Sequence, residues 1–413
     1  MDAHTSSFPM ARLSEYAEIK PGFAFKSERF TNRSSDLPLV KGDNVQQGYI
    51  DWSKSKFWNR DDIDDYREYL LEPGDIVVAM DRPWVNAGLK WAFIKSHDPK
   101  SLLVQRVARL RAKEDLSQGF LRCLVSSNYF ASYIEPIVTG VNVPHISGKQ
   151  VGDFRIPLPS MEVQEKISAI LAAYDDLIEN NKRRITLLEN MAEEIYREWF
   201  VRFRFPGWQE AEFEKGFPAN WRAVKFDEFC KLKRGYDLPD SKVMDGPYPV
   251  LASTSVKTFH GEYKVKAPVI TTGRSGSLGT VLFKRKNCWP LNTTLYVQNF
   301  KGNSPFFIYF TLKNMPLETF NSGAGVPSLN RNHLAGLRVV VPDENAQKEF
   351  DDVVEPMFRQ VDILQEQSEH LLKTKVQLLP RLISGKLSVE NLDIQFPPSM
   401  LNDKPESSNE AVA

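Results

Sequence analysis

Three polar segments occur in the same order in both halves of this 413-residue chain. As pairs they are KGDNV at 41–45 with ASTSV at 252–256, MDRPWVNAG at 80–88 with TTGRSGSLG at 271–279, and NVPHISGKQ at 142–150 with VPSLNRNH at 326–333. Gly and Ser let backbone amides approach phosphates, and Arg reads a guanine edge through two parallel hydrogen bonds. Each segment alone also fits ordinary turn chemistry. Their repetition with basic flanks favours a surface that binds nucleic acid.

The candidate contacts are the basic, amide, hydroxyl and aromatic side chains of these segments and their flanks. In the first half they are Asn44, Arg82, Trp84, Asn86 and Lys149, and in the second half they are Lys233, Ser253, Ser255, Arg274, Ser275, Asn330 and Arg331. Basic side chains would contact phosphates and give a salt-dependent affinity. The loop Arg, Asn and Ser would discriminate between bases, by roughly 1–3 kcal/mol for each good bidentate pair.

Residue types used by active sites are present, but without the required spacing. GRSGSLG at 273–279 has neither the GK[ST] ending of a P-loop nor a GxGxxG order, and the adenine-methylase motif that begins Asn/Asp-Pro-Pro is absent. The histidines are scattered singles without HExxH spacing. Cys123, Cys230 and Cys288 lie far apart with no CxxC, so neither a disulfide framework nor a thiolate metal site is indicated. We therefore expect no catalytic residue, metal or cofactor on this chain.

One catalytic alternative remains open. Pro239-Asp240 followed by Glu262-Tyr263-Lys264 fits the loose pattern of metal-dependent nucleases, in which acids hold Mg²⁺ and a Lys helps to activate water. The comparable turn of the first half, at Pro38-Leu39, lacks the acids. That difference weighs against a stand-alone nuclease.

The net charge is zero, but the charges are segregated along the chain. Residues 225–301 hold 13 Lys and Arg against 6 acids, whereas residues 343–369 hold 9 acids against Lys348 and Arg359. A basic region beside an acidic one indicates one face that binds polyanions and another that avoids them. An unevenly charged but inert surface is the alternative.

The chain nearly repeats one stretch, because residues 140–164 return as residues 323–347 at a single offset of 183 positions. The identical pairs are Gly140/Gly323, Val143/Val326, Pro144/Pro327, Arg155/Arg338, Pro159/Pro342 and Gln164/Gln347. Earlier in each half, KFDEFCKLKRGY echoes RLSEYAEIKPGF, and APVITTGR echoes GDIVVAMDR, which matches Arg274 with Arg82. The pattern predicts two similar units that perform one task at two places.

Each copy of the repeat continues into a long amphipathic helix. Apolar residues follow helical spacing through 162–200 without Pro or Gly, which predicts a helix on the order of 55 Å long. A second such stretch covers 344–383, where Pro356 and Pro380 predict kinks or breaks. Neither apolar stripe is buried by its own helix, so we expect the two helices to pair as an antiparallel, coiled-coil-like rod. Asn181 lies near the seam, either buried and fixing the register or exposed.

The remaining chain predicts an α/β (α+β) fold with two similar domains. Short runs rich in Val, Ile and Phe, such as DIVVAM at 75–80 and WAFIK at 91–95, predict strands, and helices are expected around 117–135 and at 306–315. The expected boundaries are 1–157 and 205–341 for the globular domains, 158–204 and 342–392 for the long helices, and 393–413 for a disordered tail.

The helices carry a family resemblance. LPSMEVQEKISAILAAYDDLIENNKRRITLLENMAEEIYREWFVRF at 158–203 and VPDENAQKEFDDVVEPMFRQVDILQEQSEHLLKTKVQLLPRLISGKLSV at 341–389 resemble the specificity subunit of type I restriction–modification systems. Three features carry the resemblance together. They are the P…Q…I pattern where a helix begins, REWF where the first helix ends, and LLPRLISGKL where the second helix ends. It extends to almost the whole chain through the architecture, and it is weak inside the globular regions.

The resemblance implies that each globular domain is a target-recognition domain. Each would read one half of a bipartite, asymmetric double-stranded DNA site, and the helices would set the gap between the halves. Two methylation (M) subunits, which bind S-adenosylmethionine and modify adenine, would dock on the helices, and motor–nuclease (R) subunits would join through them and use ATP and Mg²⁺. For docking we expect Tyr174, Ile185, Leu188, Trp199, Met357 and Leu371. The chain itself would be the non-catalytic recognition subunit.

A structural adaptor remains the main alternative, in which the rod organises partners and the basic region is incidental. The zero net charge favours that alternative, whereas the duplicated polar loops favour sequence recognition. The chain has no run of about 18 apolar residues that could span a membrane, and its first residues lack a secretory pattern. We therefore expect a cytoplasmic protein with no membrane contact.

Overall fold

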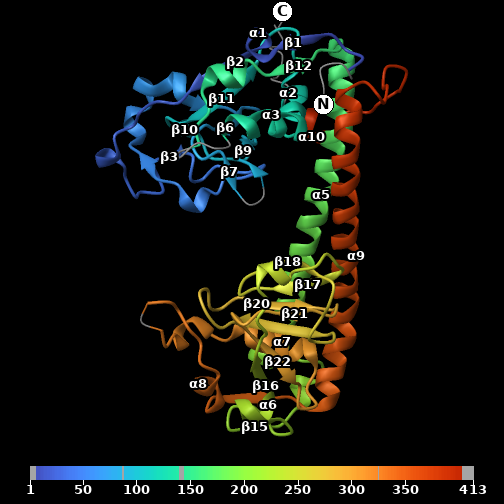
Figure 1. Cartoon of the computed structure of the whole chain (residues 1–413). Helices are drawn as coiled ribbons and strands as arrows, with labels where there is room; N and C mark the ends of the chain where they lie inside the picture. The colour runs from blue at the N-terminus through green and yellow to red at the C-terminus, as the bar shows by residue number, and fades with distance from the viewer. Residues whose placement is uncertain (1–5, 86–87, 139–143, 324, 402–413) are drawn as a thin grey trace, which may run out of the picture. The chain divides into compact units, whose positions relative to one another are not determined.

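The computed structural model describes residues 6–85, 88–138, 144–323 and 325–401, and the chain divides into two compact units (Figure 1). Unit 1 comprises residues 1–181 and 366–413, and unit 2 comprises residues 182–365. Each unit therefore contains one globular region and a part of each long helix.

Unit 1 contains two four-stranded sheets built from short apolar runs. The first has the order β2 (Ala17–Pro21), β11 (Val107–Ala112), β6 (Ile76–Ala79) and β9 (Trp91–Phe93), with antiparallel neighbours throughout. The second has the order β4 (Phe57–Trp58), β3 (Leu37–Val40), β10 (Ser101–Leu103) and β5 (Leu70–Leu71), in which β3 and β10 are parallel. Every residue of β3 and β6 is buried. Strands covered on both faces are continuous apolar runs, without alternating polar residues.

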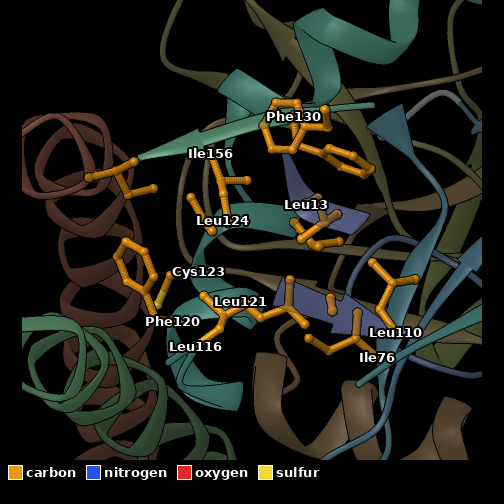
Figure 2. Close-up of a cluster of buried hydrophobic side chains, with 14 of the residues drawn as sticks. Leu13, Ile76, Leu110, Leu116, Phe120, Leu121, Cys123, Leu124, Phe130 and Ile156 are labelled. Atoms are coloured by element: carbon orange, nitrogen blue, oxygen red, sulfur yellow. The ribbon is translucent and has the colours of Figure 1, made fainter. Parts of the chain in front are cut away.

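Two helices complete the core of unit 1, namely α2 (Gln118–Val125) and α3 (Asn128–Val138). Figure 2 shows Phe120, Leu121 and Leu124 of α2 in the same buried cluster as Ile76 of β6 and Leu110 of β11. The 3.6-residue period of the helix brings positions 120, 121 and 124 onto one face, which is the face that meets the sheet.

The single helix predicted over 117–135 is interrupted between α2 and α3. The Ser127 hydroxyl donates to the Leu124 carbonyl at 2.5 Å and accepts from the Phe130 amide at 3.3 Å. Serine side chains that bond to nearby backbone offer the chain an alternative to continued helix. The prediction of one helix is therefore wrong at this point.

Unit 2 repeats this arrangement with different side chains. Its first sheet has the antiparallel order β16 (Lys231–Arg234), β22 (Thr294–Asn299), β19 (Val269–Gly273) and β20 (Val281–Lys284). Its second sheet has the order β18 (Val256–His260), β17 (Tyr248–Leu251) and β21 (Trp289–Pro290), with β17 and β21 parallel. Helix α7 (Pro305–Asn314) follows β22 as α2 follows β11. The predicted duplication and the mixed fold class are confirmed.

A repeated glycine marks the same close approach in both units. A Cβ atom on Gly22 would lie 2.3 Å from the Val104 carbonyl oxygen, and one on Gly235 would lie 2.2 Å from the Leu291 carbonyl oxygen. Only a residue without a side chain tolerates backbone contact this close. The resemblance of KPGF to KRGY in the sequence therefore has a structural cause.

The two long helices are α5 (Met161–Tyr196) and α9 (Glu344–Ile383). In unit 1, Lys166 Nζ of α5 donates to the Glu390 carbonyl at 2.7 Å, and further along α5 Asp175 accepts from Lys375 Nζ at 2.5 Å. The partner's number falls as the number along α5 rises, so the two segments run antiparallel, as predicted. Asn181 is only 6% exposed, which favours the buried alternative for this residue.

In unit 2 the end of α5 packs against the start of α9 through aromatic rings. Phe200 lies in the π-helical turn Arg197–Val201, which follows α5, and its ring centroid is 5.0 Å from that of Phe350 in α9. Trp199 lies 5.9 Å from the same ring, and Phe307 of α7 lies 4.9 Å from Phe200. Such pairs stabilise a core by about 0.5–1.5 kcal/mol beyond the area they bury. The REWF exit thus anchors α5 in the core of unit 2.

Helix α9 is continuous through Pro356 and Pro380, where the sequence predicted kinks or breaks. Both prolines are exposed, and so are Asp352 and Val376, four positions before them. The carbonyl groups that lose their N–H partners therefore lie on the solvent side, where water can bond to them. Apolar packing on the opposite side holds the helix together, and the prediction of breaks is wrong.

The repeated glutamine clamps each long helix to its domain. In unit 1, Gln164 Oε1 accepts from the Ser117 amide at 2.8 Å, immediately before α2. Its Nε2 donates to the carbonyl oxygens of Asp115 and Pro159, both at 2.9 Å. Gln164 is 1% exposed, so these bonds satisfy an amide that water cannot reach.

Unit 2 has the same clamp. Gln347 Oε1 accepts from the Ser304 amide at 2.8 Å, immediately before α7, and Nε2 donates to the Pro342 carbonyl at 3.0 Å and to Asn303 Oδ1 at 3.2 Å. One turn further along α9, Asp351 accepts a hydrogen bond from the Ser304 hydroxyl. Burial raises the pKa of Asp351 to about 6, with smaller contributions from the charges of Asp352 and Glu355.

This shift predicts a pH dependence of the stability of unit 2. Because the folded pKa of Asp351 lies above its unfolded value of 3.8, its unfavourable effect is absent below pH 4, grows as the pH rises towards 6 and is constant above. Asp351→Asn should therefore raise the free energy of unfolding at pH 8 by about 1 kcal/mol, a value reduced for partial exposure. Denaturant unfolding at pH 8 and at pH 4 measures the difference. A gain that is equal at both pH values would contradict the titration of Asp351 as its cause.

The segment after α9 folds back onto unit 1. The Ser384 carbonyl accepts from the Ser7 amide at 3.0 Å, and Val389 and Ile394 pack against the core. The short helix α10 (Pro398–Leu401) follows, and the Ser399 amide donates to Asp176 at 3.4 Å. Disorder was expected from residue 393 onwards, so this part of the expectation is wrong for residues 393–401. No helix in the described part of the chain is long and apolar enough to cross a membrane.

Candidate nucleic-acid interface

The three polar segments of the first half converge at one place in unit 1. The Arg82 amide in the second segment donates to the Pro144 carbonyl in the third at 2.8 Å, and the Ile146 amide returns a bond of 2.8 Å to the Met80 carbonyl. Lys90, just after the second segment, donates from Nζ to the Gly42 carbonyl in the first at 2.5 Å. Segments far apart in the sequence are thus joined by direct hydrogen bonds.

Unit 2 joins its second and third segments through the same two backbone bonds and its first segment through a different side chain. The Gly276 amide donates to the Pro327 carbonyl at 2.9 Å, and the Leu329 amide donates to the Arg274 carbonyl at 2.8 Å. The Ser253 hydroxyl, from the first segment, lies 2.9 Å from the carbonyl oxygen of Ser275. Both units therefore present the same cluster of polar loops beside the first sheet.

A fourth loop, which the sequence analysis missed, supports each cluster. In unit 1 it precedes β11, and its Arg106 carbonyl accepts from the Met80 amide at 2.8 Å. In unit 2 it precedes β22, and its Thr293 carbonyl accepts from the Arg274 amide at 2.8 Å. The repeated glycines at 22 and 235, which lie against these loops, were the available signal in the sequence.

These bonds correct the alignment of the two halves. Ala79 pairs with Val107 and Gly273 pairs with Thr294, so Met80 corresponds to Arg274 and Arg82 corresponds to Gly276. The sequence comparison, which matched Arg82 with Arg274, is wrong by two positions. It followed the resemblance of two short β-branched strands, whose period of two allows more than one register.

The corrected alignment exposes an unusual backbone at Arg82. Its φ is 43°, and the equivalent Gly276 has a φ of 90°. The left-handed region is open to Gly but disfavoured for a residue with a Cβ by roughly 1–2 kcal/mol. Unit 1 therefore keeps an exposed arginine where the backbone favours glycine.

Two further candidates of unit 1, Trp84 and Lys149, are exposed. Trp84 is 38% exposed, and Lys149 is exposed on the short helix α4 (Gly148–Gly152). Asn86 lies outside the described residues. Burial lowers the pKa of Lys90, and the nearby charge of Arg82 acts in the same direction.

Asn44 does not belong to the accessible surface. It is 1% exposed, its Oδ1 accepts from the Lys41 amide at 2.8 Å, and its Nδ2 donates to the Leu39 carbonyl at 2.9 Å and to Ser55 Oγ at 3.0 Å. These bonds use both N–H groups of the amide. Asn44 therefore holds its loop in shape, and its assignment as a DNA contact is corrected.

Two of the unit 2 candidates also support the loops. The Ser253 hydroxyl lies within hydrogen-bonding distance of two carbonyl oxygens, those of Ser275 at 2.9 Å and Thr293 at 3.0 Å. Arg274 occupies the position of the buried Met80, and its Nε donates to the Asn292 carbonyl at 2.9 Å. Both side chains brace the cluster from within.

The remaining unit 2 candidates lie nearer the surface. Ser255, Asn330 and Arg331 are exposed, and Ser275 and Lys233 are half-buried. Asn330 caps the short helix α8 (Arg331–Ala335) by accepting from the Asn332 amide at 3.0 Å, and Arg331 Nη1 lies 3.4 Å from the Leu232 carbonyl. All five residues are therefore at least partly exposed in unit 2.

Two of the residues considered for a nuclease, Asp240 and Lys264, have partners within unit 2. Asp240 Oδ1 accepts from Lys257 Nζ at 2.6 Å, and Lys264 Nζ lies 4.6 Å from the ring centroid of Trp289. Asp240 therefore forms a surface ion pair, and Lys264 packs over an aromatic ring.

The six helix residues expected to dock partners are all partly covered by this chain itself: Tyr174, Ile185, Leu188, Trp199, Met357 and Leu371. Trp199 and Met357 pack against the core of unit 2. Large apolar side chains that are more exposed on the helices are Met161, Leu177, Leu187, Met191, Val353, Ile363, Leu372 and Val376. The sequence missed these because a helical period shows a stripe but not which part of the stripe the fold covers.

Comparison with known proteins covers both units. The chain matches the family model of the type I restriction modification DNA specificity domain over residues 6–190 and 218–373. It is 27% identical over 311 residues to the type I restriction enzyme MjaIX specificity subunit of Methanocaldococcus jannaschii, covering 68% of this chain and 71% of that protein. It is 36% identical over 169 residues to the type I restriction enzyme EcoAI specificity subunit of Escherichia coli, covering 41% of this chain and 28% of that protein.

A solved structure shares the fold. The crystal structure of the S subunit of a type I restriction–modification system from M. genitalium aligns over 93% of this chain and 98% of that chain, with a TM-score of 0.51 and 14% sequence identity. The family match includes both loop clusters and most of both long helices. The chain belongs to the family of type I restriction–modification DNA specificity subunits.

Proposed function

We propose that each unit of this specificity subunit reads one half of a bipartite, asymmetric DNA site. The single observation that carries the proposal is the loop cluster, which has the same backbone hydrogen bonds in both units but different side chains at its surface. A shared frame with different contacts is what two readers of different sequences require. Exposed Arg and Lys would contact phosphates, and the loop side chains would contact base edges.

We propose further that the long helices set the gap between the two half-sites and dock the partner subunits. The exposed apolar side chains of α5 and α9, Leu187 and Leu372 among them, are available for a protein interface there. Two methylation subunits would bind these helices, and motor–nuclease subunits would join through them. S-adenosylmethionine, ATP and Mg²⁺ would then be bound by those partners. This chain would supply recognition, not chemistry.

Mapping adenine methylation across the genome of the host, at single-base resolution, tests this proposal. Deleting the gene for this chain should abolish methylation at one split motif and leave other motifs untouched, and complementation should restore it. A host in which this chain's complex methylates a single, unsplit motif would contradict reading by two units.

A further inference from the structure

Three charged or polar side chains of unit 1 meet at the surface of its loop cluster. Arg106 Nη1 lies 2.8 Å from Asp81 Oδ2, and His145 Nδ1 forms a hydrogen bond of 2.5 Å with Asp81 Oδ1. Asp81 belongs to the second polar segment, His145 to the third and Arg106 to the fourth loop. One carboxylate therefore links three loops, and none of the three residues was a candidate from the sequence.

Exposure distinguishes the roles of the three side chains. The side chain of Asp81 is 21% exposed, whereas those of Arg106 and His145 are 67% and 51% exposed. The carboxylate is the inner group and its two partners are the outer ones. Because Asp81 engages His145 through Nδ1, the ring nitrogen left for a ligand is Nε2. Arg106 keeps further N–H groups of its planar guanidinium for a second partner.

Unit 2 shows that the fold of the loops does not need these charges. The residues equivalent to Asp81 and His145 are Ser275 and Ser328, and the same isolated β-bridge joins each pair. Thr293 stands in the place of Arg106, with the same backbone bond to the second segment. A neutral set of Ser, Thr and Ser thus supports the same frame. The fold of the loops therefore does not explain why unit 1 carries charged residues at these positions.

The backbone conformation of Arg106 also indicates a binding role for this loop. Its φ is 69°, in the left-handed region that non-glycine residues seldom occupy. In the described part of unit 1, the non-glycine residues with positive φ are Arg82, Arg106 and Asp115, and two of these three are arginines of the loop cluster. Backbone strain of this kind concentrates at sites that bind ligands.

We propose that Asp81, Arg106 and His145 form a base-reading triad, in which Arg106 and His145 contact base edges of the unit 1 half-site and Asp81 is their positioning residue. The inference rests on the proposed function of unit 1 and names the groups that give it specificity. A carboxylate repels phosphate, so its place between the two groups disfavours a general phosphate contact. A guanidinium held on one side by a carboxylate loses little freedom when it forms a bidentate bond to guanine.

The test exchanges the charged set for the neutral set of unit 2 through the combined substitutions Asp81→Ser, Arg106→Thr and His145→Ser. The complex is purified from its host through a tag on this chain, and the probes are a duplex carrying the mapped motif and a duplex with the unit 1 half scrambled. The thermal midpoint should stay within a few degrees of the wild type. Affinity for the motif should fall about ten- to a hundredfold, and affinity for the scrambled duplex should not fall. Methylation should relax in one half of the motif only.

Asp81→Asn separates positioning from a merely structural role. Removing the negative charge should raise affinity for the scrambled duplex severalfold while lowering the ratio of motif to scrambled binding. Loss of binding to both duplexes would assign Asp81 to folding alone. Arg67→Thr is the matched control, because Arg67 also pairs with a carboxylate, Asp64, has a side chain that is 74% exposed, and belongs to none of the polar loops. The Arg67→Thr substitution should change the affinity for neither duplex.

The outcomes for the triad and for the proposed function are distinguishable. An unchanged half-motif in the combined variant would overturn the triad and leave reading by two units intact. If the wild-type complex bound the motif duplex and the scrambled duplex equally well, both the triad and the reading of DNA by two units would be overturned.

Discussion

Replacing Arg82 with Gly should weaken binding of the motif duplex about tenfold or more, and should at the same time stabilise unit 1 by about 0.5–1 kcal/mol. Arg82 holds a φ of 43°, and Gly276 occupies the equivalent position in unit 2 with a φ of 90°. Gly relieves the strain of the left-handed backbone, although its greater freedom in the unfolded chain offsets part of the gain. The Arg82 amide keeps its bond to the Pro144 carbonyl in the variant. Thermal unfolding and duplex titration measure the two effects.

The opposite signs make this substitution informative. Lys215→Gly is the control, since Lys215 is exposed in unit 2 with a φ of 53° and lies outside both the polar loops and the basic region 225–301. It should stabilise its unit by a similar amount and leave DNA binding unchanged. If Arg82→Gly lowered stability and binding together, Arg82 would be needed for the loop's own structure. That result would contradict a direct role of Arg82 in DNA recognition.

Replacing Gln164 or Gln347 with Ala should lower the free energy of unfolding of its own unit by about 3 kcal/mol. Each amide makes three hydrogen bonds and is at most 6% exposed. Truncation leaves the Ser117 or Ser304 amide without its partner at the start of α2 or α7, and a buried unsatisfied group costs about 1–3 kcal/mol by itself. Denaturant unfolding, followed through each unit's own transition, measures the loss.

Gln367→Ala provides the comparison for this effect. Gln367 lies on α9 but is exposed, so its substitution should change stability by less than about 0.5 kcal/mol. If the buried glutamines proved no more sensitive than Gln367, the clamp would not be what joins the long helices to the domains.

Features with a strong local signal could be predicted from the sequence. The helical period predicted α5 nearly to its ends, because no residue between 162 and 196 opposes it. The ungapped repeat around Gln164 and Gln347 predicted the duplication, and the structure shows why these residues recur. In both units the glutamine accepts from a serine amide before a helix and donates to the carbonyl of the repeated proline. The polar loops were found because Gly, Ser and Arg gather in them.

Features that depend on contacts distant in the chain could not be predicted. Asn44 has the residue type of a DNA contact, and only the positions of Leu39 and Ser55 show that its amide is already bonded. A proline inside a helix usually kinks or breaks it. Only the exposure of the residues around Pro356 explains why α9 continues there. Asp81 and His145 are 64 positions apart, and no pattern in the sequence joins them.

The most direct test of two-unit reading is the methylation map of the host, compared among a deletion strain and strains complemented with the wild-type chain or with Arg82→Gly. The account predicts a split motif that vanishes on deletion, returns with the wild type, and returns with only one relaxed half in the variant. Survival of every methylated site on deletion, or equal relaxation of both halves by the variant, would contradict it.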